Sequence, residues 1–140
     1  GPHEQGNRLV SNIITSLLQN KEALCTHGKQ SRDFLHVSDV ADALVTVLEH
    51  DVTGTINIAS GQSVQIKELA SIIAKKLGKE HLIKLGAIPF SKDEPLFVGV
   101  NVERLKTEVN WKPTYDLNTG IEETILWWES FIKKHNDTHH

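Results

Sequence analysis

The chain has 140 residues, of which 39% are hydrophobic and 24% are charged, and its formal net charge is −3. This length predicts one domain with a core of its own, and the ordinary composition excludes an intrinsically disordered chain. The slightly acidic balance excludes the basic footprint of a nucleic-acid-binding or anionic-membrane-binding protein, and no apolar run approaches the length that spans a bilayer.

In chain order, the hydrophobic periodicity predicts helices alternating with short strands, which is a mixed α/β fold. Residues 1–7 are expected to be a loop, with Asn7 as the N-cap of the first helix. The predicted helices cover residues 8–19, 38–50, 66–77, 101–108 and 117–134. The predicted strands cover residues 23–26, 33–37, 55–59 and 82–88, with a further short extended piece at 96–100.

Several residues mark the expected helix ends. Ser38 suits an N-cap because its hydroxyl can accept a backbone N–H, and Asp39 then places a carboxylate near the positive end of the helix. Gln65 precedes the third helix and predicts weak capping there, because a Ser or Thr is missing. Gly78 is the expected residue beyond the C-terminus of that helix. The Asn57 amide is expected to tie its strand to a neighbouring loop.

The domain prediction is a single domain over residues 1–135, followed by a polar, frayed tail or tag remnant over residues 136–140. The chain contains no methionine. We therefore expect it to be part of a longer protein. Cys25 is the only cysteine, which excludes an internal disulfide and favours a reducing, cytoplasmic location. The histidines are dispersed along the chain, so no metal site is predicted.

The most informative stretch is Arg32-Asp33-Phe34-Leu35-His36-Val37-Ser38-Asp39-Val40-Ala41-Asp42-Ala43-Leu44, which is predicted to be a strand leading directly into a helix. Arg32 carries a planar, permanently charged fork that suits a phosphate or a carboxylate. From spacing alone, an ion pair with Asp33 or another surface acid is the simpler interpretation, and an anionic ligand is the alternative.

This stretch resembles the signature of the second half of the extended short-chain dehydrogenases/reductases, the nucleotide-sugar epimerases and dehydratases. Four further segments are similar to motifs of that family and follow in the family's order. They are Gly1-Pro2-His3-Glu4 with Arg8-Leu9-Val10, then Thr55-Ile56-Asn57-Ile58-Ala59-Ser60-Gly61, then Asn110-Trp111-Lys112-Pro113, and finally Gly120-Ile121-Glu122-Glu123-Thr124-Ile125-Leu126-Trp127-Trp128.

The resemblance implies the C-terminal, substrate-binding part of a Rossmann-type enzyme that lacks its N-terminal dinucleotide-binding half. The family's Gly-rich cofactor loop and its Tyr-x-x-x-Lys pair are absent from this sequence. Four residues after Tyr115, where the pair would have its lysine, the chain has Thr119. We therefore expect no catalysis by this chain alone and no cofactor bound by it. The parent enzyme would use NAD or NADP, and the missing Rossmann half would be its first partner.

The resemblance also implies a site for a nucleotide-diphosphate sugar. Arg32 would contact the diphosphate or the adjacent sugar, and Arg8, at the start of the first helix, would add a second cation. The main chain of residues 24–27, including Cys25 and His27, would read the base, although Cys25 is otherwise expected to be a buried small hydrophobe. Lys92 lies in a loop where a second phosphate contact is conceivable, but a solvated charge is the simpler interpretation.

Other functions remain open at this stage. A self-standing, non-catalytic sugar-nucleotide binding or assembly module would have the same site. A helix-turn-helix DNA-binding module beginning at residues 68–78 is a remote alternative, because it requires a recognition helix directly afterwards and a basic surface. If part of the sheet is missing, apolar surface should be exposed on residues 38–50 or 55–59, and a homo-oligomer could cover it.

Overall fold

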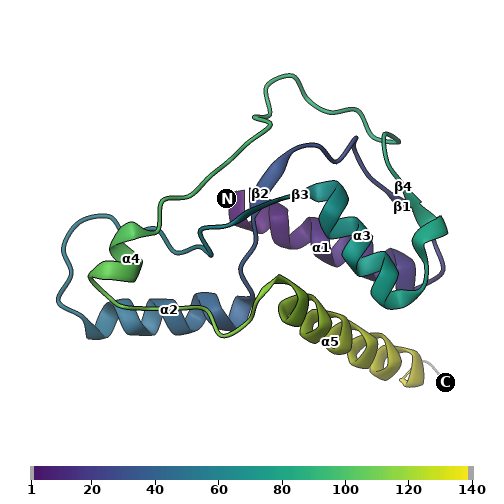
Figure 1. Cartoon of the computed structure of the whole chain (residues 1–140). Helices are drawn as coiled ribbons and strands as arrows, with labels where there is room; N and C mark the ends of the chain where they lie inside the picture. Colours follow the sequence, from purple (N-terminus) through teal and green to yellow (C-terminus); the bar gives the residue numbers. More distant parts are fainter. Residues whose placement is uncertain (1, 139–140) are drawn as a thin grey trace.

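The computed structural model describes the backbone of residues 2–138 and the side chains of residues 8–138. Figure 1 shows two lobes joined by short connections, with a long loop arching from one lobe to the other. In order, the elements are α1 (Pro2–Leu18), β1 (Ala23–Leu24), β2 (Ser31–Asp33), α2 (Val37–Glu49), β3 (Ser63–Gln65), α3 (Ile66–Leu77), the 3₁₀ turn η1 (Glu80–Leu82), β4 (Ile83–Lys84), α4 (Glu103–Thr107) and α5 (Leu117–Asp137).

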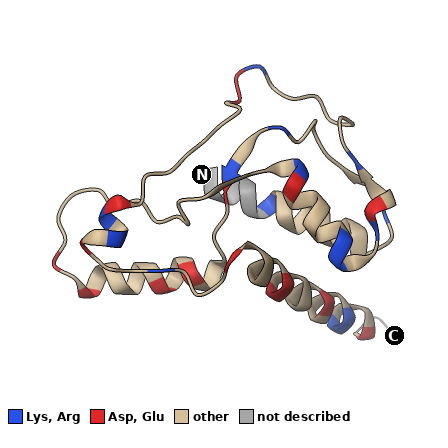
Figure 2. Ribbon diagram, in the orientation of Figure 1, with Lys and Arg blue, Asp and Glu red and all other residues tan. Residues whose placement is uncertain are grey.

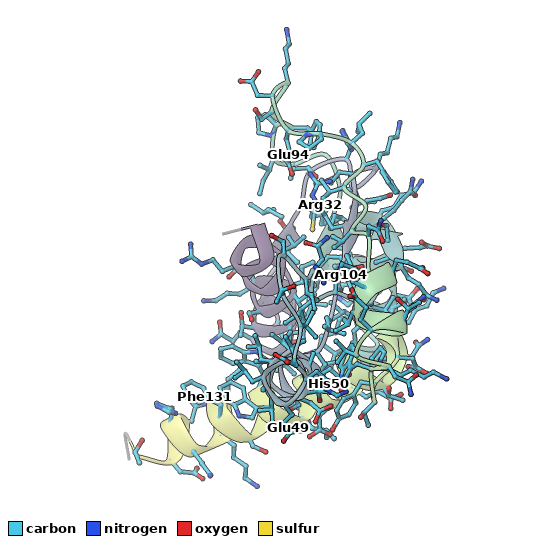
Figure 3. All side chains as sticks on the ribbon, turned by 90° about the vertical axis from the view of Figure 1, so that its left-hand side faces the viewer. Arg32, Glu49, His50, Glu94, Arg104 and Phe131 are labelled. Atoms are coloured by element: carbon cyan, nitrogen blue, oxygen red, sulfur yellow. The ribbon has the colours of Figure 1, made fainter. Side chains whose placement is uncertain are left out.

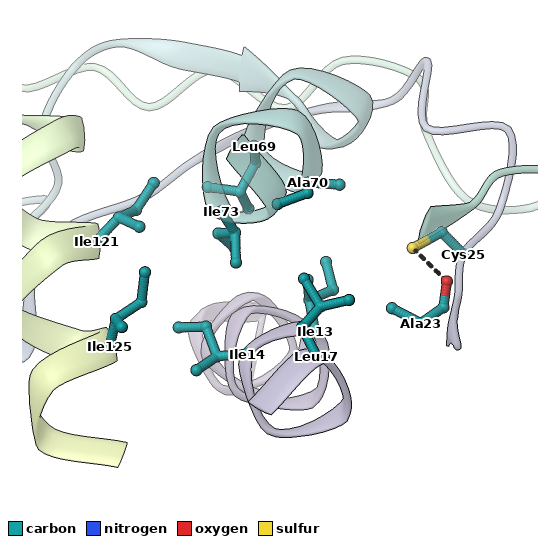
Figure 4. Packing of buried hydrophobic residues seen from close by; sticks show 11 residues of the cluster. Ile13, Ile14, Leu17, Ala23, Cys25, Leu69, Ala70, Ile73, Ile121 and Ile125 are labelled. Carbon is teal, nitrogen blue, oxygen red and sulfur yellow. Dashed lines mark hydrogen bonds between the residues drawn. The ribbon is translucent and has the colours of Figure 1, made fainter. Parts of the chain in front are cut away.

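The larger lobe is built from helices α1, α3 and α5, which pack on one another. Apolar residues recur at helical spacing in each of them, so each helix turns one face inward. Figure 4 shows these side chains meeting, with Ala23 and Cys25 closing one end of the cluster. The buried helical residues are Ile13, Ile14, Leu17, Leu69, Ala70, Ile73, Ala74, Ile121 and Ile125.

The smaller lobe contains α2 and α4 with the segments around them. Its buried cluster is Ala43, Ala59, Val102, Leu105, Val109 and Trp111. Arg104 of α4 also holds the loop at residues 53–55 against the smaller lobe. Its guanidinium donates to the carbonyls of Thr53 and Thr55 at 2.7 and 2.8 Å. The amide of Asn57 donates to the carbonyl of Asn101 at 3.0 Å, which confirms the predicted tie to a neighbouring loop.

The strands are fewer and shorter than predicted. β1 pairs in parallel with β4, and β2 pairs antiparallel with β3. The prediction of strands at 33–37 and 55–59 is wrong, because β2 ends at Asp33 and residues 55–59 form no strand in the described chain. Strand propensity alone does not make a strand, because a ladder needs a neighbouring chain to accept its hydrogen bonds.

The observed helices confirm most of the predicted helices, but several of them begin or end at other residues than predicted. Helix α1 begins at Pro2, so the predicted loop at 1–7 with an Asn7 cap is wrong for the residues described. Helix α2 begins at Val37 and is capped by His36, whose Nδ1 accepts the N–H of Ser38 at 3.1 Å, instead of by Ser38 itself. Helix α5 extends to Asp137, beyond the predicted end.

Helix α3 lacks a side-chain cap at Gln65, as predicted, and ends at Gly78 with φ 64°. Main-chain carbonyls replace the missing cap: Ile66 N–H donates to the carbonyl of Gln30 at 3.0 Å, and Lys67 N–H donates to the carbonyl of Gly28 at 2.9 Å. The loop before β2 therefore satisfies the first turn of α3, which fixes that loop against the larger lobe.

Apolar side chains are exposed on α2, as the sequence predicted. The exposed fractions are 49% for Leu44, 54% for Val45 and 84% for Leu48. Beside this helix, Val37, Val40, Ile56, Ile58 and neighbouring residues line a hollow of about 370 Å³. Single exposed apolar residues are ordinary, but this helix face and the adjoining hollow form a larger apolar surface.

Candidate functional site

Strand β2 holds Arg32 between two neighbouring segments. On one side Arg32 is opposite Val64 of β3. On the other, Ser31 N–H donates to the carbonyl of Leu96 at 2.7 Å, and Val98 N–H donates to the carbonyl of Ser31 at 3.2 Å. The site is therefore a three-segment arrangement in which the long loop after β4 runs alongside β2.

The guanidinium of Arg32 binds three oxygen atoms of the protein. Nη1 donates to the carbonyl of Ser31 at 2.7 Å, and Nη2 donates to Oε1 of Glu94 and to the carbonyl of Pro95, both at 2.8 Å. Figure 3 shows Arg32 and Glu94 close together at one end of the molecule. Of the two interpretations from the sequence, the ion pair with a surface acid is therefore what the structure shows, with Glu94 as the acid instead of Asp33.

Arg32 is not sealed inside the protein. Its side chain is 20% exposed and that of Glu94 is 41% exposed. All residues from 91 to 97 are exposed as well. Solvent and small anions can therefore reach the guanidinium once the carboxylate moves.

Asp33 has a different role from the one considered in the sequence. Its Oδ1 accepts the N–H and the hydroxyl of Ser60, both at 2.9 Å, and its Oδ2 accepts the N–H of Gly61 at 2.8 Å. A carboxylate that accepts several main-chain donors fixes a turn firmly. Asp33 therefore anchors the 60–61 turn and leaves Arg32 to other partners.

Sequence reasoning missed two further carboxylate anchors on α2. Asp39, which is 2% exposed, accepts the N–H groups of Thr114 and Tyr115, each at 2.9 Å. Asp42 accepts the indole N–H of Trp111 at 2.8 Å. The acidic residues of the Arg32–Leu44 stretch thus connect α2 to the segment before α5.

The main chain around Cys25 is paired with the segment after β4. Cys25 N–H donates to the carbonyl of Lys84 at 3.0 Å, and its own carbonyl accepts the N–H of Ile88 at 3.1 Å. The side chain is 2% exposed, and burial raises the pKa of the Cys25 thiol, so it is a buried small hydrophobe as expected. The ring of His27 lies 4.5 Å from that of Phe90, between centroids.

Arg8 is exposed in the body of α1, since the helix begins at Pro2. The expectation that it stands at a helix start, where an incoming anion would find helix N–H groups, is therefore wrong. Whether its side chain reaches a ligand stays a prediction.

A larger hollow of about 1220 Å³ is lined by residues that include Val64, the partner of Arg32 in β3, but not by Arg32 itself. It opens between α1, α5 and the start of α2, and His36, Tyr115, Trp127 and Trp128 contribute to its wall. The rings of His36 and Tyr115 are in contact, with centroids 4.4 Å apart. Among the described residues there is no group of three His, Cys, Asp or Glu side chains arranged to hold a metal ion.

The order of elements after α3 bears on the nucleic-acid alternative. α3 is followed by η1 and β4, not by a second helix, so this part of the chain does not form a helix-turn-helix. In Figure 2 the ribbon of α2 carries several acidic residues, in red, and α5 carries both acidic and basic residues, so neither helix has a basic surface. Within the described part of the chain, no helix has the length and apolar character needed to cross a bilayer.

Comparison with known proteins places these features in a family context. The family model described as GDP-mannose 4,6 dehydratase matches residues 1–124. CDP-abequose synthase of Salmonella typhimurium is 31% identical over 132 residues, an alignment that covers 89% of this chain and 44% of that protein. The chain thus spans less than half of the first curated relatives it matches.

Solved structures give the same result for the fold. The structure of dTDP-glucose 4,6-dehydratase from Bacillus anthracis, in complex with NAD, is similar with a TM-score of 0.79 and 28% identity; the alignment covers 87% of this chain and 39% of that one. That of UDP-N-acetylglucosamine 4-epimerase from Methanobrevibacter ruminantium, in complex with UDP-N-acetylmuramic acid, gives a TM-score of 0.78 and 26% identity, covering 86% and 39%.

Proposed function

The chain belongs to the GDP-mannose 4,6 dehydratase family of extended short-chain dehydrogenases/reductases, and we propose that it is the nucleotide-diphosphate-sugar-binding part of an NAD- or NADP-dependent epimerase or dehydratase. The observation that carries this proposal is the state of Arg32. Its side chain is 20% exposed, and its Nη2 donates to one carboxylate oxygen of Glu94, which shows that this nitrogen can pair with an anionic oxygen such as that of a phosphate. Structures of relatives support a nucleotide sugar as the ligand class, since one holds UDP-N-acetylmuramic acid.

In this proposal Arg32 binds the diphosphate, and Arg8 is a second candidate cation. The main chain of residues 24–27, including Cys25 and His27, faces the base. Part of this main chain is already paired, since the N–H of Cys25 donates to the carbonyl of Lys84 and the carbonyls of Cys25 and Thr26 accept the N–H groups of Ile88 and Gly86. A base would therefore have to bind other main-chain groups of this segment or the second lone pairs of those carbonyls. The nicotinamide cofactor and the catalytic groups would be supplied by the dinucleotide-binding half, and turnover by the 140-residue chain alone would contradict this division.

Replacing Arg32 with alanine tests the ligand site. We expect the dissociation constant for the best-bound nucleotide sugar to rise at least about tenfold, because a charge-assisted hydrogen bond contributes about 1.5–3 kcal/mol. Isothermal titration with UDP-glucose, CDP-glucose, dTDP-glucose and GDP-mannose measures it. Lys133→Ala removes the same charge from an exposed position on α5 and should leave the constant unchanged. Equal affinity in wild type and Arg32→Ala would remove Arg32 from the site.

We further propose that the dinucleotide-binding half covers the exposed face of α2. The support is the combination of exposed Leu44, Val45 and Leu48 with the apolar hollow beside Val37 and Ile58. Such a face suits the surface of a sheet, whose side chains are apolar where a helix covers them. In the isolated chain this face has no such cover, and a second copy is the nearest substitute.

Leu48→Glu tests that face. We expect the isolated chain to self-associate and the variant to associate at least about tenfold more weakly, because burying a leucine contributes about 1.5–3 kcal/mol. Sedimentation velocity over a concentration series measures the effect. Leu126→Glu makes the same change at another exposed leucine, on α5, and should leave association unaltered. The assignment of the face to α2 would be wrong if Leu126→Glu had the larger effect.

A further inference from the structure

The carboxylate of Glu94 occupies the position at Arg32 that an anionic ligand would need. It lies 2.8 Å from Nη2, and the carbonyl of Pro95 lies at the same distance from the same nitrogen. Resting on the proposed function, we propose that Glu94 is an internal competitor of the ligand's diphosphate, and that binding of a nucleotide diphosphate displaces it from Arg32 and releases the turn at residues 91–95.

The competition follows from the chemistry of the two anions. A guanidinium has a limited number of N–H donors in a fixed fork, and a carboxylate oxygen and a phosphoryl oxygen require the same ones. With Nη1 on the carbonyl of Ser31, and Nη2 shared between Glu94 and Pro95, the ligand cannot pair with Nη2 fully while Glu94 remains. A diphosphate carries more charge and more acceptors than a carboxylate, so we expect it to displace the tethered Glu94 carboxylate at sufficient ligand concentration.

The turn that carries Glu94 can be displaced without disturbing the rest of the fold. It is closed on itself, since Glu94 N–H donates to the carbonyl of Ser91 at 3.2 Å and Asp93 N–H donates to the Ser91 hydroxyl at 3.3 Å. All residues from 91 to 97 are exposed, so displacing the turn breaks no buried packing.

The chain directly after the turn is anchored. Leu96 and Val98 bond to the main chain of Ser31, and the carbonyl of Val98 accepts the Ser63 hydroxyl at 3.1 Å. The rest of the β2 neighbourhood therefore stays in place when the carboxylate leaves. Leu96 is the first anchored residue after the turn, so the movement is confined to residues 91–95.

The expected size of the effect is modest, because both partners are partly exposed and their attraction is screened. If the free protein spends most of its time in the Glu94-bound state, removing the carboxylate raises the fraction that is ready to bind. We expect Glu94→Gln to bind the nucleotide sugar about two- to fivefold more tightly than wild type.

Asp93→Asn is the matched control. It changes the net charge by the same amount at the adjacent residue, which is also exposed, and should leave the dissociation constant unchanged. Titration of wild type, Glu94→Gln and Asp93→Asn with UDP-glucose, CDP-glucose, dTDP-glucose and GDP-mannose gives the comparison. An equal gain in both variants would reduce the effect to general electrostatics and overturn the proposal, as would weaker binding by Glu94→Gln, which would make Glu94 a ligand contact.

Two further measurements separate failure of this inference from failure of the proposed function. In the Arg32→Ala background, Glu94→Gln should have no effect on binding. Without ligand, amide hydrogen exchange at residues 91–94 should be faster in Glu94→Gln than in wild type, because only the ion pair with Arg32 is lost. Binding that depends on Arg32 but not on Glu94 overturns only the competition, whereas no binding by any variant overturns the proposed function and the competition with it.

Discussion

Replacing Gly28 with alanine is expected to lower the free energy of unfolding by about 2–5 kcal/mol. The φ of Gly28 is +72°, where a residue with a Cβ is strained by about 1–2 kcal/mol. A Cβ there would also lie 2.7 Å from Cβ and 2.8 Å from the backbone nitrogen of Lys67, so the loop and the start of α3 would have to separate. Forced overpacking of this kind costs about 1–3 kcal/mol more.

Gly86→Ala isolates the steric part of this prediction. Gly86 has a similar φ of +78°, but nothing lies within 4 Å of its added Cβ. The free energy of unfolding of Gly86→Ala should therefore fall only by the backbone strain at positive φ, about 1–2 kcal/mol. Urea denaturation of both variants beside wild type measures the difference. If Gly86→Ala were as destabilising as Gly28→Ala, the close approach to Lys67 would not be the cause.

Asp39→Ala is expected to lower the free energy of unfolding by about 2–4 kcal/mol. The substitution leaves the N–H groups of Thr114 and Tyr115 without the acceptor that each now has at 2.9 Å. A hydrogen bond to a charged acceptor contributes about 1.5–3 kcal/mol, and the Asp39 side chain that accepts these two is buried. The same variant should show faster amide exchange at those residues than at the core of α1.

The control for Asp39 is Asp51→Ala, which removes an exposed carboxylate from the loop after α2. Exposed substitutions of this kind usually change stability by no more than about 0.5 kcal/mol. A loss of the same size in both variants would show that net charge, not the paired amides, explains the effect.

The helices could be predicted from the sequence because their signals are local. Apolar spacing located the bodies of α2, α3 and α5, and Gly78 marked the end of α3. The start of α1 was missed because the residues before Arg8 carry no apolar repeat. The strands failed for a different reason: a stretch such as 55–59 has strand propensity, but its hydrogen-bonding partner is not encoded within the stretch.

The candidate site could also be predicted only in part from the sequence. Arg32 could be singled out because its residue type and its position before Asp33 are visible in the sequence. Its partner could not, because Glu94 lies 62 residues away, and the only residue of that loop considered for a phosphate contact was Lys92. The anchoring by Asp39 and Asp42 was also invisible, since an acid in the first turns of a helix looks like a simple response to the helix dipole.

The paired amides of Asp39 and the indole contact of Asp42 have a mechanical consequence. Both carboxylates belong to α2, and both grip the short connector that leads into α5, which itself packs on α1 and α3. These hydrogen bonds fix the connector at residues 111–115 to α2. A connector without them could act as a hinge between the two lobes, whereas this one couples the position of α2 to that of α5. If the proposed displacement of residues 91–95 occurs, we expect these contacts to keep the two lobes in one arrangement, so that free and ligand-bound crystals superimpose over both lobes.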